Sequence, residues 1–484
     1  MSKEALEVRR LPARLTSDPR HTITRFFWLG PARAKRVVER VMRLSDEQTT
    51  DLLARTMQEF DHLHVELADV FLNHYEEVAQ HVDMPGPLTA DRKRLLGAYF
   101  TLEYAFASVA MFNPSIAPAI NQQGVEPGSL RFAMSLRCIG EGHLSSIVFR
   151  RGIVDRRGNI TLEPAGPYRE PKRTFEDRRI SKAEARAKLA QLGVRETALE
   201  AVLERLKDPF NLLVLRALLC RMQTDTGGIQ LCDDDIWKIE WLTSCDYRVE
   251  IAPDANISQV VLFPICEAES RGMEDMRIVR FTDDDGSMRY YGTYTAYNGW
   301  LTRPQIVEMA TPGIAYVHSL QGRCAKDKGL ALFPRKVRGR YMMSGRIDGE
   351  NLYVLASDNI RVWDEAALIQ EPKFTWESVQ IGNCGSPIET EAGWLLLTHG
   401  VGPMRRYCIG ASLLDLNDPT KLIGRLDEPL LAPAPDERTG YVPNVVYSCG
   451  AIVHNGLLII PYGISDAATG FATIALNDLL AKLC

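Results

Sequence analysis

Short apolar segments separated by turn residues dominate the chain from Asn113 onward and limit the fold more than any other feature. Rich in Val, Ile, Tyr and Phe, eleven of them follow one another: RFAMSLR, SSIVFRRG, QVVLFPI, RIVRF, RYYGTYTAY, GRYMMSGR, NLYVLAS, GWLLLTHG, YCIGASLLDL, GAIVHNGLLIIPYG and GFATIAL. Short strands with hairpin-like spacing are typical of β-sandwiches, barrels and propellers. The sequence therefore predicts a mainly β domain over residues 109–484, in one of these three architectures.

The first hundred residues have a different pattern, which is typical of helices. Pro31 suits the first position of a helix, and Ser45 begins a capping box, in which side chains satisfy free backbone amides. Apolar residues at three- and four-residue spacing continue over 30–82, and 88–110 is predicted to be one more helix. Residues 1–108 are thus expected to form an α-helical N-terminal extension. Its apolar face could dock on the β domain or pair with a second subunit, and we expect a homo-oligomer.

A second helical segment interrupts the strands over about residues 170–228. Ser181 and Glu184 form another capping-box pattern, and Gly193 stands where the end of a helix favours glycine. Two further helical stretches, ALEAVLERL and FNLLVLRALLCRM, follow before the strands resume. We therefore expect a helical insertion within the β domain.

The composition excludes several classes of function. Of the 484 residues, 45% are apolar and 25% charged, and the net charge is −5, which is the balance of an ordinary globular protein. Basic residues concentrate in Arg33–Arg43 and Arg169–Lys188, but acidic or apolar residues interrupt both stretches. No basic stripe for nucleic acid is therefore predicted. No apolar run reaches the length of a signal peptide or a membrane span, so we expect a cytoplasmic protein that does not bind a membrane.

Cysteine usage favours a reducing compartment. The ten cysteines form no CxxC pair and lie mostly inside apolar stretches. This pattern predicts reduced thiols in the core rather than disulfides or a zinc site. No set of His, Asp and Glu has the spacing of metal ligands, so no metal and no cofactor is expected.

Polar clusters at the ends of predicted strands are the candidates for a functional site. Five of them stand out: FNPSI at 112–116, SLRCIGEGH at 135–143, MEDMR at 273–277, LTHG at 397–400 and YGISD at 462–466. Propellers and barrels gather loop residues from many strands at one mouth. The five clusters are therefore expected to meet there although they lie far apart in the sequence.

Asp275 is the candidate catalytic acid. Cleavage of a glycosidic bond by water or phosphate requires a proton for the leaving oxygen and a nucleophile on the other face of the sugar. Asp275 precedes the strand RIVRF, where the neighbouring Glu274 could raise its pKa and Arg277 could hold it in place. A salt-bridge cluster on the surface would produce the same pattern.

Other polar residues in these clusters are candidates for binding. Arg137 lies between apolar neighbours in a strand and needs a carboxylate or a ligand as partner. Asn113 and Ser115 flank a proline, in a segment that an ordinary turn would also explain. His143 and His399 each stand beside a glycine at a strand end. Either histidine alone would be interpreted as structural, but two in equivalent places favour a function.

Several ordered motifs together resemble glycoside hydrolase family 130, the β-mannoside phosphorylases and β-mannosidases. They are NPS at 113–115, LR at 136–137, EDMR at 274–277 followed by YYGTYTAYNG, FPRK at 333–336, GWLLLTHGVG at 393–402, IGASLLDLNDPTKLIGR at 409–425 and YVPNVVYSCGAIVHNGLLIIPYGISD at 441–466. The resemblance covers about residues 110–165 and 230–484. It implies a five-bladed β-propeller and an inverting enzyme that acts on β-mannosides.

The resemblance also implies roles for individual residues. The Asp of the ED-x-R motif is the family's catalytic acid, which corresponds to Asp275 here. In the phosphorylases it is thought to protonate the leaving oxygen through the 3-hydroxyl of the bound mannose. By the same matching, Asn113, Ser115, Arg137 and Asp466 are expected to line the pocket of the non-reducing mannose.

A second group of residues is expected around these. Glu274, Arg277 and His143 adjoin the motif residues and are candidates for substrate binding. On the side from which phosphate attacks, the resemblance places His399 and either Lys336 or Arg346.

Two basic residues shortly after His399 are further candidates for phosphate contacts. They are Arg405 and Arg406, although a solvated pair in a loop would explain them equally well.

Two departures from the family pattern concern the reaction. Met276 stands where the family commonly has proline, which should alter the turn but not the acid. Glu389 in SPIETEAGW stands where many phosphorylases have a basic residue. A carboxylate there would repel phosphate and could act as a general base for water.

Three functions are therefore compatible with the sequence. The first is an inverting phosphorylase that cleaves a β-mannoside, preferably β-1,2-linked, with inorganic phosphate as co-substrate to give mannose 1-phosphate. The alternatives are an inverting β-mannosidase and a non-catalytic carbohydrate-binding propeller. Phosphorolysis conserves the bond energy in a form useful only inside a cell, which favours the first. Asp275, Arg137 and Asp466 together argue against the third.

Overall fold

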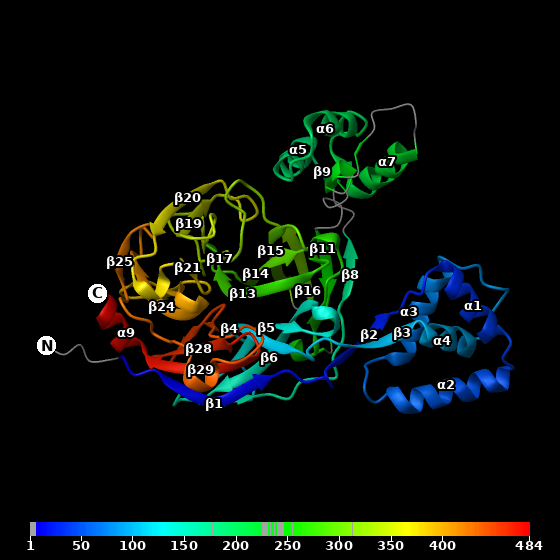
Figure 1. Ribbon diagram of the computed structural model, residues 1–484, viewed down its shortest axis with the longest axis horizontal. Coiled ribbons are helices and arrows are strands. Elements are labelled where there is room, and N and C mark those ends of the chain that lie inside the picture. The colour runs from blue at the N-terminus through cyan, green and yellow to red at the C-terminus, as the bar shows by residue number, and fades with distance from the viewer. Residues whose placement is uncertain are drawn as a thin grey trace.

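The strands of the chain form antiparallel sheets that surround a common centre. A computed structural model describes residues 6–175, 179–224, 231, 232, 234–236, 238, 239, 246–253, 255–311 and 313–484. Residues 176–178 and 225–228 of the expected insertion, and Cys245, lie outside these ranges. In Figure 1, β4, β13, β17 and β21 lie nearest the centre, while β1, β20 and β25 lie at the periphery.

Most of the strands fall into five groups, which are numbered by the position of their innermost strand in the chain. Group 1 contains β4 (Ala110–Pro118), β5 (Leu130–Ile139), β6 (Ser145–Val154), β7 (Ile160–Leu162) and β12 (Val261–Leu262). Group 2 contains β13 (Gly272–Thr282), β14 (Met288–Tyr297), β15 (Thr302–Thr311), β16 (Ile314–Ser319), β11 (Tyr247–Glu250) and β8 (Lys172–Phe175). A single parallel pair, Gly272 with Ser145, joins these two groups into one sheet.

The other three groups are separate sheets. Group 3 contains β17 (Ala331–Leu332), β18 (Tyr341–Gly345), β19 (Leu352–Ser357) and β20 (Glu365–Gln370). Group 4 contains β21 (Gln380–Asn383), β22 (Ile388–Thr390), β23 (Gly393–Gly402), β24 (Arg406–Leu414) and β25 (Leu422–Arg425). Group 5 contains β26 (Val446–Tyr447), β27 (Ile452–His454), β28 (Leu457–Ile464), β29 (Ala468–Ala475) and β1 (Arg9–Thr16). The predicted mainly β domain is confirmed.

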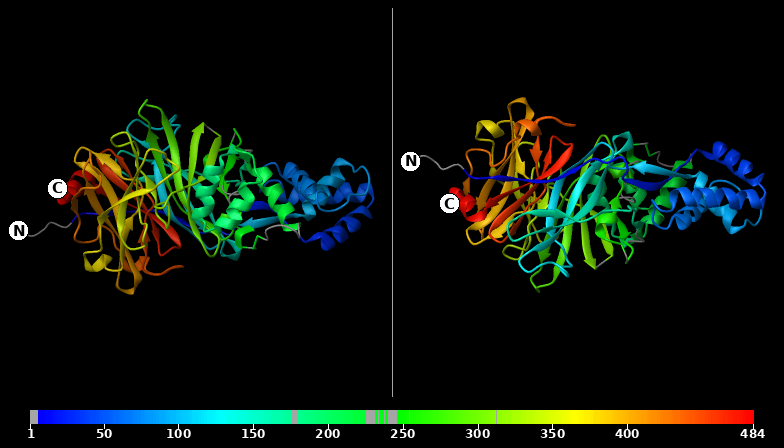
Figure 2. Two further views of the ribbon diagram at one scale, coloured as in Figure 1. Left: turned by 90° about the horizontal axis from the view of Figure 1, so that it is seen from above. Right: turned by 90° about the horizontal axis from the view of Figure 1, so that it is seen from below.

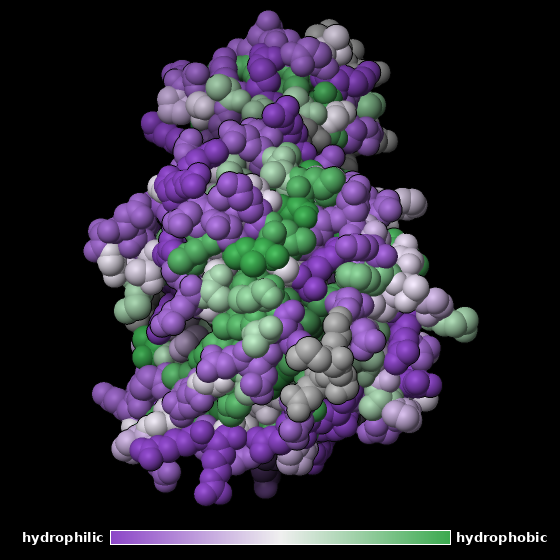
Figure 3. Space-filling view, turned by 90° about the vertical axis from the view of Figure 1, so that its left-hand side faces the viewer, coloured by the Kyte–Doolittle hydropathy of each residue, from purple (hydrophilic) through white to green (hydrophobic). Residues whose placement is uncertain are grey.

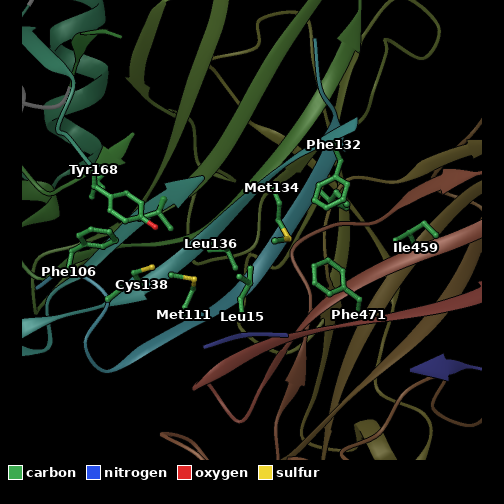
Figure 4. Packing of buried hydrophobic residues seen from close by; sticks show 14 of the residues in the cluster. Leu15, Phe106, Met111, Phe132, Met134, Leu136, Cys138, Tyr168, Ile459 and Phe471 are labelled. Atoms are coloured by element: carbon green, nitrogen blue, oxygen red, sulfur yellow. The ribbon is translucent and has the colours of Figure 1, made fainter. Parts of the chain in front are cut away.

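Apolar side chains from successive groups pack against each other all the way around. Separate buried clusters join groups 1 and 2, 2 and 3, 3 and 4, and 4 and 5. A further cluster joins group 5 back to group 1, where Figure 4 shows Phe132 of β5 beside Phe471 of β29. Because strands alternate their side chains between two faces, each sheet can contact a neighbour on both sides.

The first strand of the chain completes the last sheet. β1 pairs antiparallel with β29, with Arg9 opposite Thr473 and Thr16 opposite Ala468. Arg10 of β1 also binds the buried Glu437, its Nη2 lying 3.1 Å from Oε2. This segment lies within residues 1–108, which are expected to form a helical extension. The prediction missed it because a single strand whose partner lies over 450 residues away carries no local signal.

The helices form two units outside the sheets. The N-terminal unit contains α1 (Pro31–Met42), α2 (Asp46–Phe60), α3 (Leu67–Ala79) and α4 (Ala90–Tyr99), with the pair β2 (Thr22–Phe26) and β3 (Thr101–Ala105). The inserted unit contains α5 (Lys182–Gln191), α6 (Glu196–Leu203) and α7 (Leu212–Thr224), with the pair β9 (Arg179–Ile180) and β10 (Phe210–Asn211). The last helix, α9 (Leu476–Leu483), packs on group 4.

Local capping signals predicted the starts of helices well. Ser45 accepts a hydrogen bond from the Gln48 amide in a complete capping box, and Ser181 caps α5. The helix expected over 88–110 is wrong in its second half, because α4 ends at Tyr99 and residues 101–105 pair with β2. Thr101, Leu102 and Tyr104 suit a strand, so the pairing with β2 decides the structure there.

Figure 2 shows α1–α4 projecting from one end of the molecule, while α9 lies at the other end. Figure 3 views the side where β20, β25 and α9 lie in Figure 1, and a band of apolar side chains crosses it. Among the residues with described positions, no helix combines the length and the apolar character needed to cross a bilayer.

Five loops of equivalent position define one face of the sheets. In each group the start of the first strand lies opposite the end of the second, as with Gly272 and Tyr297 or Gln380 and Val401. Counted across each sheet from its innermost strand, with β22 and β27 left out, the loops that join the second strand to the third therefore lie beside the starts of the first strands. These loops, residues 140–144, 298–301, 346–351, 403–405 and 465–467, are called the rim loops below.

Candidate active site

Two β-bulges aim polar side chains of β4 and β13 at each other. The pairing of β13 with β14 is interrupted between Glu274 and Arg277, and Asp275 there has a φ of 52°. The pairing of β4 with β5 is interrupted in the same way, and Asn113 has a φ of 50°. Asp and Asn adopt this left-handed conformation more readily than other residues with side chains, and a bulge redirects the side chain it carries.

A network of charges surrounds the Asp275 carboxylate. Asn113 Nδ2 donates a hydrogen bond of 2.9 Å to Asp275 Oδ1, and Arg137 Nη1 lies 3.6 Å from the same oxygen. Arg137 Nη2 also donates to Glu274 Oε1 at 2.8 Å, and Lys328 Nζ donates to Glu274 Oε2 at 2.6 Å. The two acids and two cations therefore alternate, so that each group lies beside one of opposite charge. The interpretation of this motif as an exposed surface cluster is wrong.

Arg277 holds the bulge from behind. Its guanidinium donates three hydrogen bonds: Nη1 to the carbonyl oxygen of Asp275 at 2.9 Å, Nη2 to Tyr447 Oη at 2.7 Å and Nε to the carbonyl oxygen of Cys384 at 3.1 Å. Asp275, Cys384 and Tyr447 belong to groups 2, 4 and 5 or to their loops. Arg277 is buried, and these contacts fix the backbone at Asp275.

The two carboxyl groups closest to the centre of the site titrate differently. Burial alone would raise the pKa of Asp275, but Arg137, Arg277 and the Asn113 hydrogen bond outweigh it and lower that pKa below its usual value. Burial and the charge of Asp275 raise the pKa of Asp466 to about 7. Near neutral pH the free protein thus has a charged Asp275 and an Asp466 that is often protonated.

His399 and Arg346 form a second part of the site. His399 Nδ1 lies 3.2 Å from the carbonyl oxygen of Asn383, so Nδ1 carries the proton and Nε2 is the acceptor, which lies 3.5 Å from the side-chain amide nitrogen of Gln380. Burial and the charges of Arg346 and Arg277 hold the pKa of His399 well below its usual value. A Cβ atom at Gly382 would lie 2.5 Å from the His399 ring and 2.7 Å from Arg346, so only glycine leaves room for both.

Several polar atoms around the site are buried without a hydrogen-bond partner. They are Asn113 Oδ1, Arg137 Nε, Asp327 Oδ2, Arg346 Nε and Asn383 Oδ1. Buried polar atoms are normally paired, so a cluster of unpaired ones marks a place where a polar ligand can supply the missing partners. Both donors and acceptors are present, as binding of sugar hydroxyls and of an anion requires.

Three other predicted residues lie in the rim loops or on β4. Arg405 lies close enough to Asp466 for its charge to lower the pKa of that carboxyl. His143 stacks on Tyr441 with the rings 6.0 Å apart. Ser115 is fully buried, and its Oγ accepts a hydrogen bond from the Ile278 amide, so it joins β4 to β13.

Lys336 and Glu389 lie elsewhere. Lys336 Nζ binds Asp283 at 2.8 Å, just beyond Thr282, which is about 23 Å along β13 from Asp275. Glu389 binds Arg335 at 2.6 Å and pairs with Trp394, about 17 Å along β23 from His399.

Arg406, the other basic residue proposed for phosphate, is exposed at the start of β24.

Sequence reasoning missed four residues of the site: Asp327, Lys328, Asn383 and Tyr447. Tyr447 lies within a segment that carried the family resemblance, so that signal could have found it. Asp327 and Lys328 lie in a loop and Asn383 ends a short strand, and none stands in a motif that points to chemistry. Only their contacts with Arg346, Glu274 and His399 identify them.

Comparison with known proteins places this geometry in context. A family model described as β-1,4-mannooligosaccharide phosphorylase matches residues 254–483. A 1,2-β-oligomannan phosphorylase from Thermoanaerobacter sp. (strain X514) is 36% identical over 217 residues, which are 44% of this chain and 71% of that protein. A β-1,2-mannobiose phosphorylase from the same organism is 37% identical over 210 residues, 43% of this chain and 68% of that protein.

Among solved structures, a complex of β-1,2-mannobiose phosphorylase from Listeria innocua with β-1,2-mannobiose is similar. It is 21% identical, with a TM-score of 0.46, and the match covers 78% of this chain and 92% of that one.

Proposed function

Because this chain belongs to glycoside hydrolase family 130, we propose that it is an inverting β-mannoside phosphorylase. Its substrate is a β-linked manno-oligosaccharide, with β-1,2 linkage favoured by the names of the relatives, and its product is mannose 1-phosphate. One observation carries the proposal beyond family membership. A carboxyl for proton transfer, Asp275, and a histidine that adjoins Arg346 and can help to hold phosphate, His399, both lie within the electrostatic reach of Arg277.

The acidic side of the site suits the non-reducing mannose. Asn113, Arg137 and Asp466 surround Asp275 and offer both donors and acceptors to sugar hydroxyls. Asp275 would deliver its proton to the leaving oxygen, through the sugar's 3-hydroxyl if it acts as the family's acid does. In the free protein the pKa of Asp275 is low, so substrate binding has to favour its protonated form. A bound sugar excludes water and a phosphate anion offsets Arg137 and Lys328, and both effects raise that pKa.

The basic side suits phosphate. Arg346 lies beside Asp327, whose Oδ2 is 3.9 Å from its Nε, and this long contact leaves its guanidinium available for a bidentate contact with phosphate. Neutral His399 can accept a hydrogen bond from the hydroxyl of monohydrogen phosphate at Nε2, in place of its contact with Gln380. An oxygen of the phosphate would then attack the anomeric carbon on the face opposite the leaving group, which inverts the configuration.

Hydrolysis with Glu389 as base receives no support from its contacts. Both of its carboxylate oxygens accept hydrogen bonds from Arg335, at 2.6 and 2.8 Å. A general base must lie within hydrogen-bond reach of the attacking water. The distance of Glu389 along β23 from His399 argues against that role, and we retain the phosphorylase. A purely carbohydrate-binding role would give no reason for the network that fixes Asp275.

We also infer that the five sheet groups are the blades of a five-bladed β-propeller. The closed order of packing, from group 1 to group 5 and back, supports this arrangement. So does β1, which adds the first residues of the chain to the last sheet as its outer strand. On this view residues 109–484 with β1 form the catalytic domain, and the rest of residues 1–108 is a helical extension.

Two predictions concern the protein in its cell. We propose that the enzyme is cytoplasmic, because a sugar phosphate is useful only where it can be metabolised. We also propose that α1–α4 mediate homo-oligomer formation, because Phe27, Trp28, Leu63 and Tyr99 expose large apolar surfaces there. Light scattering that finds the same oligomeric state after a short linker replaces residues 27–100, which leaves β1 in place, would refute the second proposal.

The function is tested by incubating the purified protein with β-1,2-mannobiose, with and without inorganic phosphate. We expect α-mannose 1-phosphate and mannose only when phosphate is present, identified by phosphorus and proton NMR. Free mannose at the same rate without phosphate would make the enzyme a hydrolase. β-Mannose 1-phosphate as the first product would contradict the inverting mechanism.

A further inference from the structure

The five rim loops are equivalent in topology, and four of them carry residues already assigned to the site. His143, Arg346, Arg405 and Asp466 belong to the rim loops of groups 1, 3, 4 and 5. The fifth rim loop, residues 298–301 of group 2, contributes no assigned residue. Its most prominent side chain is Trp300, which is 94% exposed.

The backbone of this loop is firmly held although its indole is free. Asn298 Oδ1 accepts hydrogen bonds from the amides of Trp300 and Leu301 at 3.0 and 2.8 Å. Tyr297 Oη donates to the carbonyl oxygen of Gly299 at 2.9 Å. The loop therefore presents the indole from a fixed backbone, which reduces the entropy lost when a ligand binds.

A chain of contacts ties this loop to the catalytic carboxylates. Lys328 Nζ lies 5.8 Å from the centre of the Tyr297 ring and donates to Glu274, the neighbour of Asp275. Tyr297 also pairs with Gly272, which precedes Asp275 by three residues, or about 10 Å along β13. Trp300 thus stands beyond the rim of the site, too far for the cleaved bond but within reach of sugars further along a bound chain.

Exposure of an indole to water to this extent is unfavourable in free energy, because the folded chain does not bury its apolar surface. Trp is usually well buried, and exposed aromatic side chains beside a site favour a partner with an apolar face. A pyranose ring offers such a face, formed by its C–H groups, while its hydroxyls remain in water. The surroundings of the loop are polar and cationic, through Arg271 and Lys328, which suits a hydroxyl-rich ligand better than an apolar one.

We propose that Trp300 forms a distal subsite that binds mannose units beyond the cleaved linkage. This proposal rests on the proposed function and specifies its preference for chain length. A disaccharide fills only the pocket around Asp275 and the position next to it, and does not reach Trp300. Longer oligosaccharides stack a further sugar on the indole and bind more tightly.

The test compares phosphorolysis of β-1,2-mannobiose and β-1,2-mannohexaose by the full-length enzyme and its variants. In Trp300→Ala we expect kcat/KM for the hexasaccharide to fall about fivefold, through KM, while the value for the disaccharide is unchanged. Trp300→Phe should retain most of the activity on the hexasaccharide. The matched control is Met288→Ala, because Met288 is also exposed, at 62%, but begins β14 at its opposite end. Met288→Ala should change kcat/KM for neither oligosaccharide.

Equal losses on both substrates would show that Trp300 acts at the cleaved bond and would overturn the proposal, as would no loss on either. If the wild-type enzyme releases no sugar phosphate, the proposed function fails instead. Calorimetric titration of both oligosaccharides into the wild-type and Trp300→Ala proteins then tests binding at Trp300 independently of catalysis. Weaker binding of the hexasaccharide alone would support it, and unchanged binding would overturn it.

Discussion

Arg277→Lys tests whether Arg277 positions Asp275 from within the protein. The guanidinium donates to three acceptors in three parts of the structure, the carbonyl oxygens of Asp275 and Cys384 and the hydroxyl of Tyr447. A lysine keeps the charge but has a single nitrogen at the end of a flexible chain, so it can satisfy one of these acceptors and leaves two unpaired.

The cost follows from these contacts. A buried hydrogen bond to a charged group contributes about 1.5–3 kcal/mol, so the loss of two should lower the free energy of unfolding by about 3–6 kcal/mol. Asp275, no longer held at its carbonyl, should also relax from its left-handed conformation. A misplacement of about 1 Å at a reacting group can reduce turnover about a hundredfold. We therefore expect kcat to fall about a hundredfold while KM changes little.

Urea denaturation and steady-state phosphorolysis measure the two effects. Arg280→Lys is the matched control, because Arg280 lies on the same strand but is exposed, and it should behave as wild type. If the free energy of unfolding of Arg277→Lys lies within about 1 kcal/mol of the wild-type value, the three hydrogen bonds do not stabilise the fold as inferred. A normal kcat with a raised KM would show that Arg277 binds substrate rather than positions Asp275.

Three further predictions follow from the site. Asp275→Asn should lower kcat by about 10²–10⁴-fold in the phosphorolysis assay, while its circular dichroism spectrum stays that of the wild type. A variant with nearly full activity would show that Asp275 is not the catalytic acid. The pKa of Asp466 is raised to about 7, so its stabilising proton is fully bound below about pH 4 and lost as the pH rises through about 7. Thermal denaturation should thus show that Asp466→Asn raises Tm, relative to wild type, more at pH 8 than at pH 5; the reverse order would contradict the shift. Gly382→Ala should reduce activity and raise the KM for phosphate, because its methyl group would displace His399 or Arg346, and an unchanged KM would place phosphate elsewhere.

Local sequence patterns were sufficient for features whose cause is local. The capping residues Ser45 and Ser181 marked the starts of α2 and α5, since a side-chain oxygen three residues before a free amide acts within one turn. Alternating apolar runs located the longer strands in the same way. The boundary at Tyr99 failed because pairing with a distant strand outweighed a helical pattern there.

The sequence by itself determined a mainly β domain with helical additions, and its motifs identified Asp275 and most of its neighbours. Only the tertiary structure decided which charges meet. Lys336 lies in a family motif and Lys328 does not, yet Lys336 binds Asp283 near the far end of β13 and Lys328 binds Glu274 beside Asp275. Glu389 likewise is paired with Arg335 rather than facing the site. The physical reason is that a side chain's electrostatic partners depend on distances of a few ångströms between strands that the sequence separates by tens or hundreds of residues.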